Sequence, residues 1–67
     1  MKKYWRFMRT LTADVHFYTA QLDCVPIAVF IDNELVGAGP IKELTPDSVK
    51  IGTERFMRKN CTFKYAE

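Results

Sequence analysis

The stretch SVKIGTERFMRKNCTFKY, residues 48–65, alternates apolar and cationic side chains with the period of two that is typical of β-strands. A two-residue turn at 52–53 would join two short strands as a hairpin. In that register Val49 lies opposite Phe56, which makes an apolar pair for the core. Lys50 lies opposite Arg55 on the outer side, where like charges across a strand pair are mildly destabilising. The stretch therefore predicts a hairpin with an apolar inside and a cationic outside.

The end of the chain repeats this alternation after a short link at 58–60. In the expected closing strand, 61–65, one side carries Cys61, Phe63 and Tyr65, and the other carries Thr62 and Lys64. We expect Phe63 to be buried with the apolar side of the hairpin.

Working backwards along the chain, more strands and turns are expected. Residues 25–31 form a nearly continuous apolar run, which favours a strand covered on both sides. Asp32 and Asn33 suit a two-residue turn because both tolerate positive φ. Residues 34–44 read as one long strand that bends at Gly-Ala-Gly-Pro, 37–40, where it passes from one sheet to another. A turn at 45–48 leads into the hairpin.

The N-terminal third is harder to assign. Residues 15–22 are rich in β-branched and aromatic side chains and are expected to form a strand. Residues 1–12 fit either a short helix or a strand. We favour the helix because Tyr4, Phe7, Met8 and Leu11 form an uninterrupted helical stripe.

Size and composition limit the architecture. Sixty-seven residues make one domain, 1–67, with a small core. No apolar run is long enough to span a membrane, and no secretory signal is visible, so a cytoplasmic location is expected. The two cysteines, Cys24 and Cys61, are then expected to be small buried side chains rather than a disulfide.

The sequence thus predicts a mainly β domain, a small antiparallel barrel of five or six strands, with a short N-terminal helix before it as the favoured alternative for residues 1–12. The order of a bent strand, a tight hairpin, a short link and a closing strand, carried by GAGPIKELTPDSVKIGTERFMRKNCTFKY, resembles the Sm-like and Src-homology-3-type barrels. This resemblance implies a fold and no particular activity, because small barrels carry many unrelated functions.

Catalysis and cofactor binding find little support in the residues. The single histidine, His16, is not accompanied by a nucleophile and a third group in the pattern of a catalytic triad. We therefore interpret it as a structural residue. His16, Asp23, Cys24 and Cys61 have no metal-binding spacing. We expect no enzyme activity, no cofactor, no metal and no small-molecule substrate.

Two binding hypotheses remain. The first is self-association, or a role as an accessory protein-binding subunit, because basic ends flank an acidic middle and so small a core gains from burying more apolar surface. The second is nucleic-acid binding, with phosphates held by cations and a base stacked on an aromatic ring. Its candidate residues are Lys50, Arg55, Arg58, Lys59, Lys64, Tyr65 and Trp5. The alternative interpretation is that these basic strands are ordinary solvated faces, since charged side chains also discourage edge-to-edge aggregation of sheets.

Overall fold

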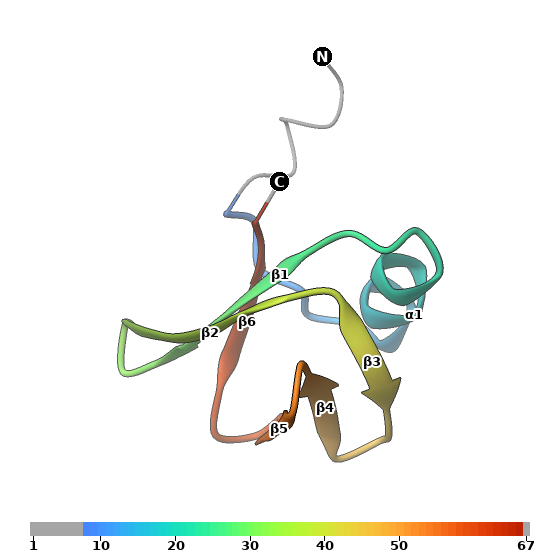
Figure 1. Ribbon diagram of the computed structural model, residues 1–67. Coiled ribbons are helices and arrows are strands. Elements are labelled where there is room, and N and C mark those ends of the chain that lie inside the picture. Colours follow the sequence, from blue (N-terminus) through green and yellow to red (C-terminus); the bar gives the residue numbers. More distant parts are fainter. Residues whose placement is uncertain (1–7, 67) are drawn as a thin grey trace.

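The computed structural model describes residues 8–66 of the chain and contains one helix and six strands in that range. In chain order the elements are α1 (Asp14–Leu22), β1 (Ile27–Ile31), β2 (Glu34–Gly39), β3 (Ile41–Leu44), β4 (Ser48–Ile51), β5 (Glu54–Met57) and β6 (Thr62–Tyr65). The strands form two antiparallel three-stranded sheets (Figure 1). Sheet A has the order β2-β1-β6, and sheet B has the order β3-β4-β5.

The hairpin that the sequence predicts is confirmed in its register. Val49 pairs with Phe56, and Lys50 pairs with Arg55. Between β1 and β2, Asp32 and Asn33 have φ of 51° and 67°, the left-handed conformation that a tight two-residue hairpin turn requires. Alternation and turn chemistry together therefore determined both hairpins.

The predicted bend is also confirmed. β2 belongs to sheet A and β3 to sheet B, with only Pro40 between them. Gly39 has a φ of 149°, a backbone conformation that residues with a side chain rarely adopt. At Gly37, an added Cβ would lie 2.8 Å from the ring of Phe56, so the absence of a side chain lets this ring pack against β2.

The barrel is confirmed only as a mainly β, antiparallel arrangement. The strand pairing leaves two separate sheets, and no closed barrel is found within residues 8–66. The chain crosses between the sheets at Pro40 and again through the link 58–61, which contains a turn closed by the Asn60 N–H donating to the Met57 carbonyl.

The prediction of a strand at 15–22 is wrong, because this segment is the helix α1. Phe17 and Ala20, three residues apart, are its buried side chains. His16 holds the helix start, since its Nδ1 accepts the N–H groups of Thr12 and Ala13 at 3.0 and 3.1 Å. At the other end Cys24 takes a φ of 55°, and its N–H donates to the Gln21 carbonyl, a helix stop that usually employs glycine.

The helix expected at 1–12 lies partly outside the described residues, which begin at Met8. Residues 8–11 are not helical but run along β6. Met8 donates to the carbonyl of Tyr65, and Leu11 donates to that of Phe63. This pairing extends sheet A beyond β6 and covers part of an edge that would otherwise be open.

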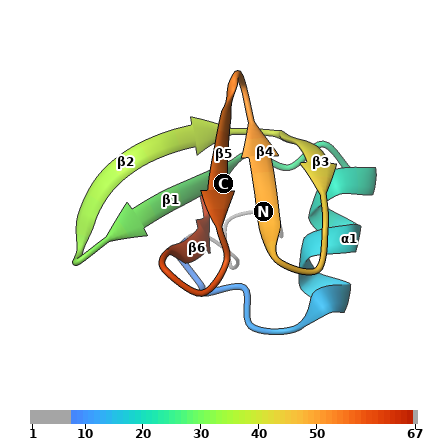
Figure 2. The same cartoon turned by 90° about the horizontal axis from the view of Figure 1, so that it is seen from below.

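The core lies between the two sheets and the helix. Ile27, Val29 and Val49 are completely buried, and the rings of Phe17 and Phe63 meet edge to face at 5.3 Å between centroids. Figure 2 shows α1 beside β3, on the opposite side of the molecule from the β1–β2 turn. The helix therefore leaves the outer side of the β1–β2 hairpin uncovered.

Candidate interaction surface

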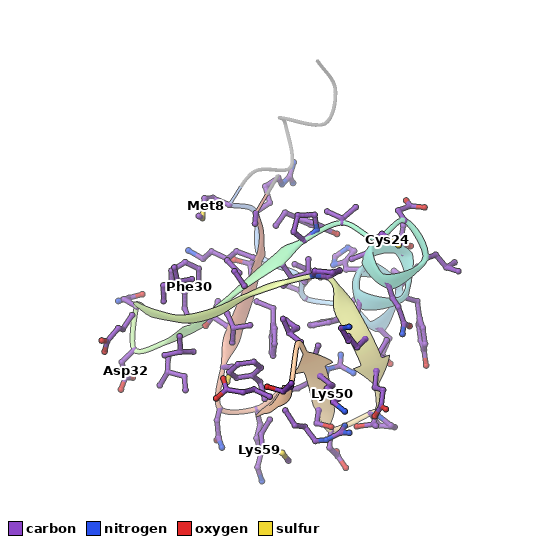
Figure 3. The ribbon with its side chains drawn as sticks, viewed as in Figure 1. Met8, Cys24, Phe30, Asp32, Lys50 and Lys59 are labelled. Carbon is purple, nitrogen blue, oxygen red and sulfur yellow. The ribbon has the colours of Figure 1, made fainter. Side chains whose placement is uncertain are left out.

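The outer side of sheet A carries a surface that we call face A. Side chains alternate along a strand, so the residues next to the buried Val29 and Phe63 in β1 and β6 point to the other side of the sheet, together with their cross-strand partners in β2. Face A consists of Ala28, Phe30, Leu35, Ala38, Thr62 and Lys64. In Figure 3 Phe30 projects from the side of the hairpin that faces away from sheet B, and no described helix or strand lies over it.

Face A is mainly apolar and incompletely buried. Phe30 is half-buried, and its cross-strand partner Leu35 is 57% exposed. Lys64 supplies the cation of this face, with its Nζ 5.4 Å from the centre of the Phe30 ring. Such a sheet face would bury a further hydrophobic layer favourably. The apolar run at 25–31 had predicted a strand covered on both sides, and this is wrong for Phe30.

The outer side of sheet B is different because its charges neutralise one another. Arg55 donates to Glu43 at 2.7 Å, and Glu43 is also the cross-strand partner of Lys50. The hydrogen bond from Arg55, with the charges of Lys50 and Arg55, holds the pKa of Glu43 below its ordinary range. The repulsion predicted between Lys50 and Arg55 is therefore offset by an acid on the adjacent strand.

Arg58 has a structural position. Its guanidinium lies over the Phe17 ring at 4.3 Å from the centroid and donates to the carbonyls of Thr45 and Pro46. It also donates to Asp14 at 2.7 Å, while its own side chain is only 18% exposed. Arg58 thus joins the link, the 45–48 turn and the start of α1.

The structure does not gather the remaining predicted nucleic-acid residues on one surface. Lys50 lies on the outer side of sheet B, Lys59 lies in the link, and Lys64 lies on face A. Figure 3 shows Lys50 and Lys59 far from Phe30. Tyr65 is a core residue with 9% exposure, so its ring does not offer a stacking surface. Trp5 lies outside the described residues.

A groove of about 590 Å³ lies next to Arg58, between the link and residues 10–12. Its apolar floor includes Leu11, Phe17 and Phe63, and its rim carries both Asp47 and Lys59. Cys61 lines the groove half-buried, and burial raises the pKa of its thiol. A thiol of this kind is less easily ionised, so it is a weaker nucleophile at neutral pH.

The cysteines and His16 do not form a reactive cluster in the described part of the chain. Both cysteines are free, and Cys24 is exposed rather than buried as predicted. Residues 8–66 contain no group of three or more His, Cys, Asp or Glu side chains that could hold a metal ion. His16 uses its Nδ1 to cap α1, a role that the sequence analysis did not identify.

A second group of exposed apolar side chains lies on α1. Val15, Tyr18 and Leu22 are 62%, 56% and 83% exposed and recur at helical spacing. Exposed Asp14 and Asp23 lie at the two ends of this stripe. Of these two acids, Asp14 is ion-paired with Arg58.

Comparisons with family models, with curated proteins and with solved structures found no match to this chain. No helix in residues 8–66 is long and apolar enough to cross a membrane.

Proposed function

We propose that this protein is a non-enzymatic interaction module that self-associates through face A. The observation that carries the proposal is the side of β1 and β2 over which no element of residues 8–66 lies, where Phe30 is half-buried and Leu35 is 57% exposed. A chain of 67 residues has little core of its own, so a second layer over this face adds a large fraction of buried apolar surface.

A second copy suits face A better than it suits the helix stripe. The helix stripe consists of three side chains on one nine-residue helix. Face A is carried by three hydrogen-bonded strands, β2, β1 and β6, and a sheet face of this kind can pack against the sheet of a second copy. Face A is mainly apolar and carries Lys64, whose Nζ lies 5.4 Å from the centre of the Phe30 ring.

The nucleic-acid hypothesis has less support. Of the cations proposed from the sequence, Arg55 and Arg58 are ion-paired with Glu43 and Asp14. A phosphate would have to displace these carboxylates, whereas a strong phosphate surface gathers several available cations. Lys64 beside Phe30 remains a single cation next to a single ring.

The architectural part of this proposal is an Sm-like or Src-homology-3-type barrel, supported by the order of helix, bent strand, hairpin, link and closing strand. The pairing of β6 with β1, which joins the two ends of the β region, also supports it. Free cysteines are compatible with a cytoplasmic protein, which is the location we propose.

Sedimentation velocity over a range of protein concentrations tests self-association. We expect the wild-type chain to form a dimer and Leu35→Glu to remain monomeric, because a carboxylate would be buried without a partner. Leu22→Glu is the matched control: Leu22 is 83% exposed on α1, and this variant should dimerise like the wild type. A wild-type monomer at every concentration, or an unaffected Leu35→Glu dimer, would contradict the proposal.

A further inference from the structure

We propose that His16 is a pH-sensitive cap of α1: its neutral imidazole ties residues 12–13 to the start of the helix, and protonation of the imidazole releases them. This cap lies on α1 and on the segment before it, not on face A, and it acts within a single copy of the chain. It does not depend on self-association.

The cap is a pair of hydrogen bonds to one ring nitrogen. His16 is the third residue of α1 and is half-buried. Its Nδ1 accepts hydrogen bonds from the N–H groups of Thr12 and Ala13 at 3.0 and 3.1 Å, and within residues 8–66 neither N–H has another acceptor. At this position of a helix a glutamate or glutamine side chain commonly reaches back to an N–H group in the same way. A neutral imidazole accepts at one nitrogen and donates at the other, so the contact requires the proton to be on Nε2.

Protonation reverses the chemistry of this contact. Both nitrogens of an imidazolium are donors, so an Nδ1–H group would point at two further N–H groups. The positive charge would also lie at the N-terminal end of a helix, where the macrodipole disfavours a cation. Both effects oppose the contact. Charged His16 therefore has to turn away, and the N–H groups of Thr12 and Ala13 pass to water.

Other charged side chains of residues 8–66 surround the start of α1. They come from the helix itself, residues 8–11, β3, the turn 45–48 and the link, and they are Asp14, Arg9, Lys42, Glu43, Asp47, Arg58 and Lys59. Carboxylate, ammonium and guanidinium groups ordinarily keep their charge between about pH 5.5 and 7.5, whereas a histidine ordinarily gains a proton there. The carboxylate of Asp14 would attract an imidazolium, but it already accepts from Arg58 at 2.7 Å. His16 is also the single histidine of the chain. A change over this pH range therefore reports on His16.

Release of residues 12–13 would alter the groove next to Arg58. Thr10, Leu11 and Thr12 form one wall of this groove. Leu11 stays held, because its N–H donates to the Phe63 carbonyl in β6. We therefore expect protonation to loosen the wall at Thr12 and the first turn of α1, while both sheets keep their pairing.

NMR spectroscopy of the wild-type chain, at a concentration below dimerisation, tests the cap directly. Nitrogen chemical shifts of the imidazole show which ring atom carries the proton, and at the neutral end of this range we expect it on Nε2. Exchange of the Thr12 and Ala13 amides with water, corrected for its intrinsic pH dependence, should be about tenfold less protected at the acid end than at the neutral end. The amide of Val29 in the central strand β1 should keep its protection. A proton on Nδ1 at neutral pH would overturn the proposal.

His16→Gln is the matched control, since an amide oxygen can accept the same N–H groups and is not protonated in this range. This variant should keep the protection of both amides across the range, whereas His16→Ala should lose it throughout. In urea unfolding, the ratio of folded to unfolded chains should fall about fivefold more for the wild type than for His16→Gln between the neutral and the acid end, since protonation removes the cap from the folded state and costs the unfolded chain nothing. Equal falls for the two chains would overturn the proposal, whatever their oligomeric state.

Discussion

The outer sides of the two sheets arise from different sequence patterns, and they differ in how far the chain itself completes them. On sheet B the polar side chains are matched within the chain: Arg55 donates to Glu43 and to the hydroxyl of Ser48. On face A the apolar side chains Phe30 and Leu35 have no described layer above them. Alternation of residue types therefore defines two sides of a strand, but only the three-dimensional partners show which side is complete. The proposal of self-association rests on this incomplete apolar side.

The most direct test of this comparison substitutes the same residue type on the two sides of sheet A. Phe63, on the inner side, is 2% exposed and packs against Phe17, whereas Phe30 lies on face A. Phe63→Ala should lower the free energy of unfolding by about 3–5 kcal/mol, enough to leave so small a domain mostly unfolded. Phe30→Ala should cost the isolated monomer about 1 kcal/mol, because its ring is only partly removed from water.

Urea unfolding followed by circular dichroism, at concentrations below dimerisation, measures both changes. If the two variants lost equal stability, Phe30 would be a core residue and face A would not be an incomplete surface. Sedimentation of Phe30→Ala adds the complementary test, because this variant should fold and yet lose the dimer.

A loss of stability of intermediate size is expected when Arg58 is removed, because this cation is ion-paired within the chain. Arg58→Ala should lower the free energy of unfolding by about 2 kcal/mol, since it deletes the contact with the Phe17 ring and leaves the carbonyls of Thr45 and Pro46 without their donor. Arg58→Lys should recover only part of this loss because an ammonium group lacks the flat, forked donor set. Thermal unfolding provides the measurement.

Lys59→Ala is the natural control for Arg58, since Lys59 is the adjacent, exposed cation in the same link. It should change stability by no more than about 0.5 kcal/mol. Equal losses for the two residues would show that Arg58 contributes only its charge, and the link would then hold a solvent-exposed cation rather than a structural one.

The parts of the fold that were predicted correctly depend on short-range rules. The hairpin register of Val49 with Phe56 follows from alternation on either side of a two-residue turn. The bend at 37–40 follows from glycine and proline, which few other local structures accommodate. These signals lie within a few residues of the feature that they determine.

The helix at Asp14–Leu22 was missed because its residue types favour strands. Val15, Phe17 and Thr19 fit an alternation, yet burial of Phe17 with Ala20 on the helical period decided the outcome. One local signal was present: Asp14 stands in the first turn, where a carboxylate is favourable, and Thr12 precedes the first helical residues. Strand propensity was overridden by the docking of Phe17 against the Phe63 ring.

The candidate site could be predicted only in part. Lys64 was named from the sequence, but Phe30 and Leu35 were not, because an apolar run does not reveal which of its sides is covered. The ion pair of Arg58 with Asp14 joins residues 44 positions apart, so no local pattern indicates it. The net charge of a segment therefore overestimated the cations available for binding.

The smallest effect we predict concerns pH and the matched side of sheet B. Arg55 and Lys50 hold the pKa of Glu43 below its ordinary value of 4.5 in the folded protein. The stabilisation that this carboxylate provides is therefore complete above the pKa of the unfolded chain and is lost as the pH falls through the lower folded pKa. Because Glu43 is exposed, we expect a small and salt-sensitive effect.

Comparison of the wild type with Glu43→Gln isolates this contribution, since the amide keeps the shape and cannot ionise. The wild type should melt slightly higher at neutral pH, and the difference should shrink as the pH falls below the ordinary pKa of a glutamate and vanish below the lowered pKa of Glu43 in the folded protein. High salt should reduce the difference at neutral pH and leave it near zero in acid. A difference that did not depend on pH would show that Arg55 is not neutralised by Glu43. In that case sheet B would present an available cation, and the contrast between its outer side and face A would lose its physical basis.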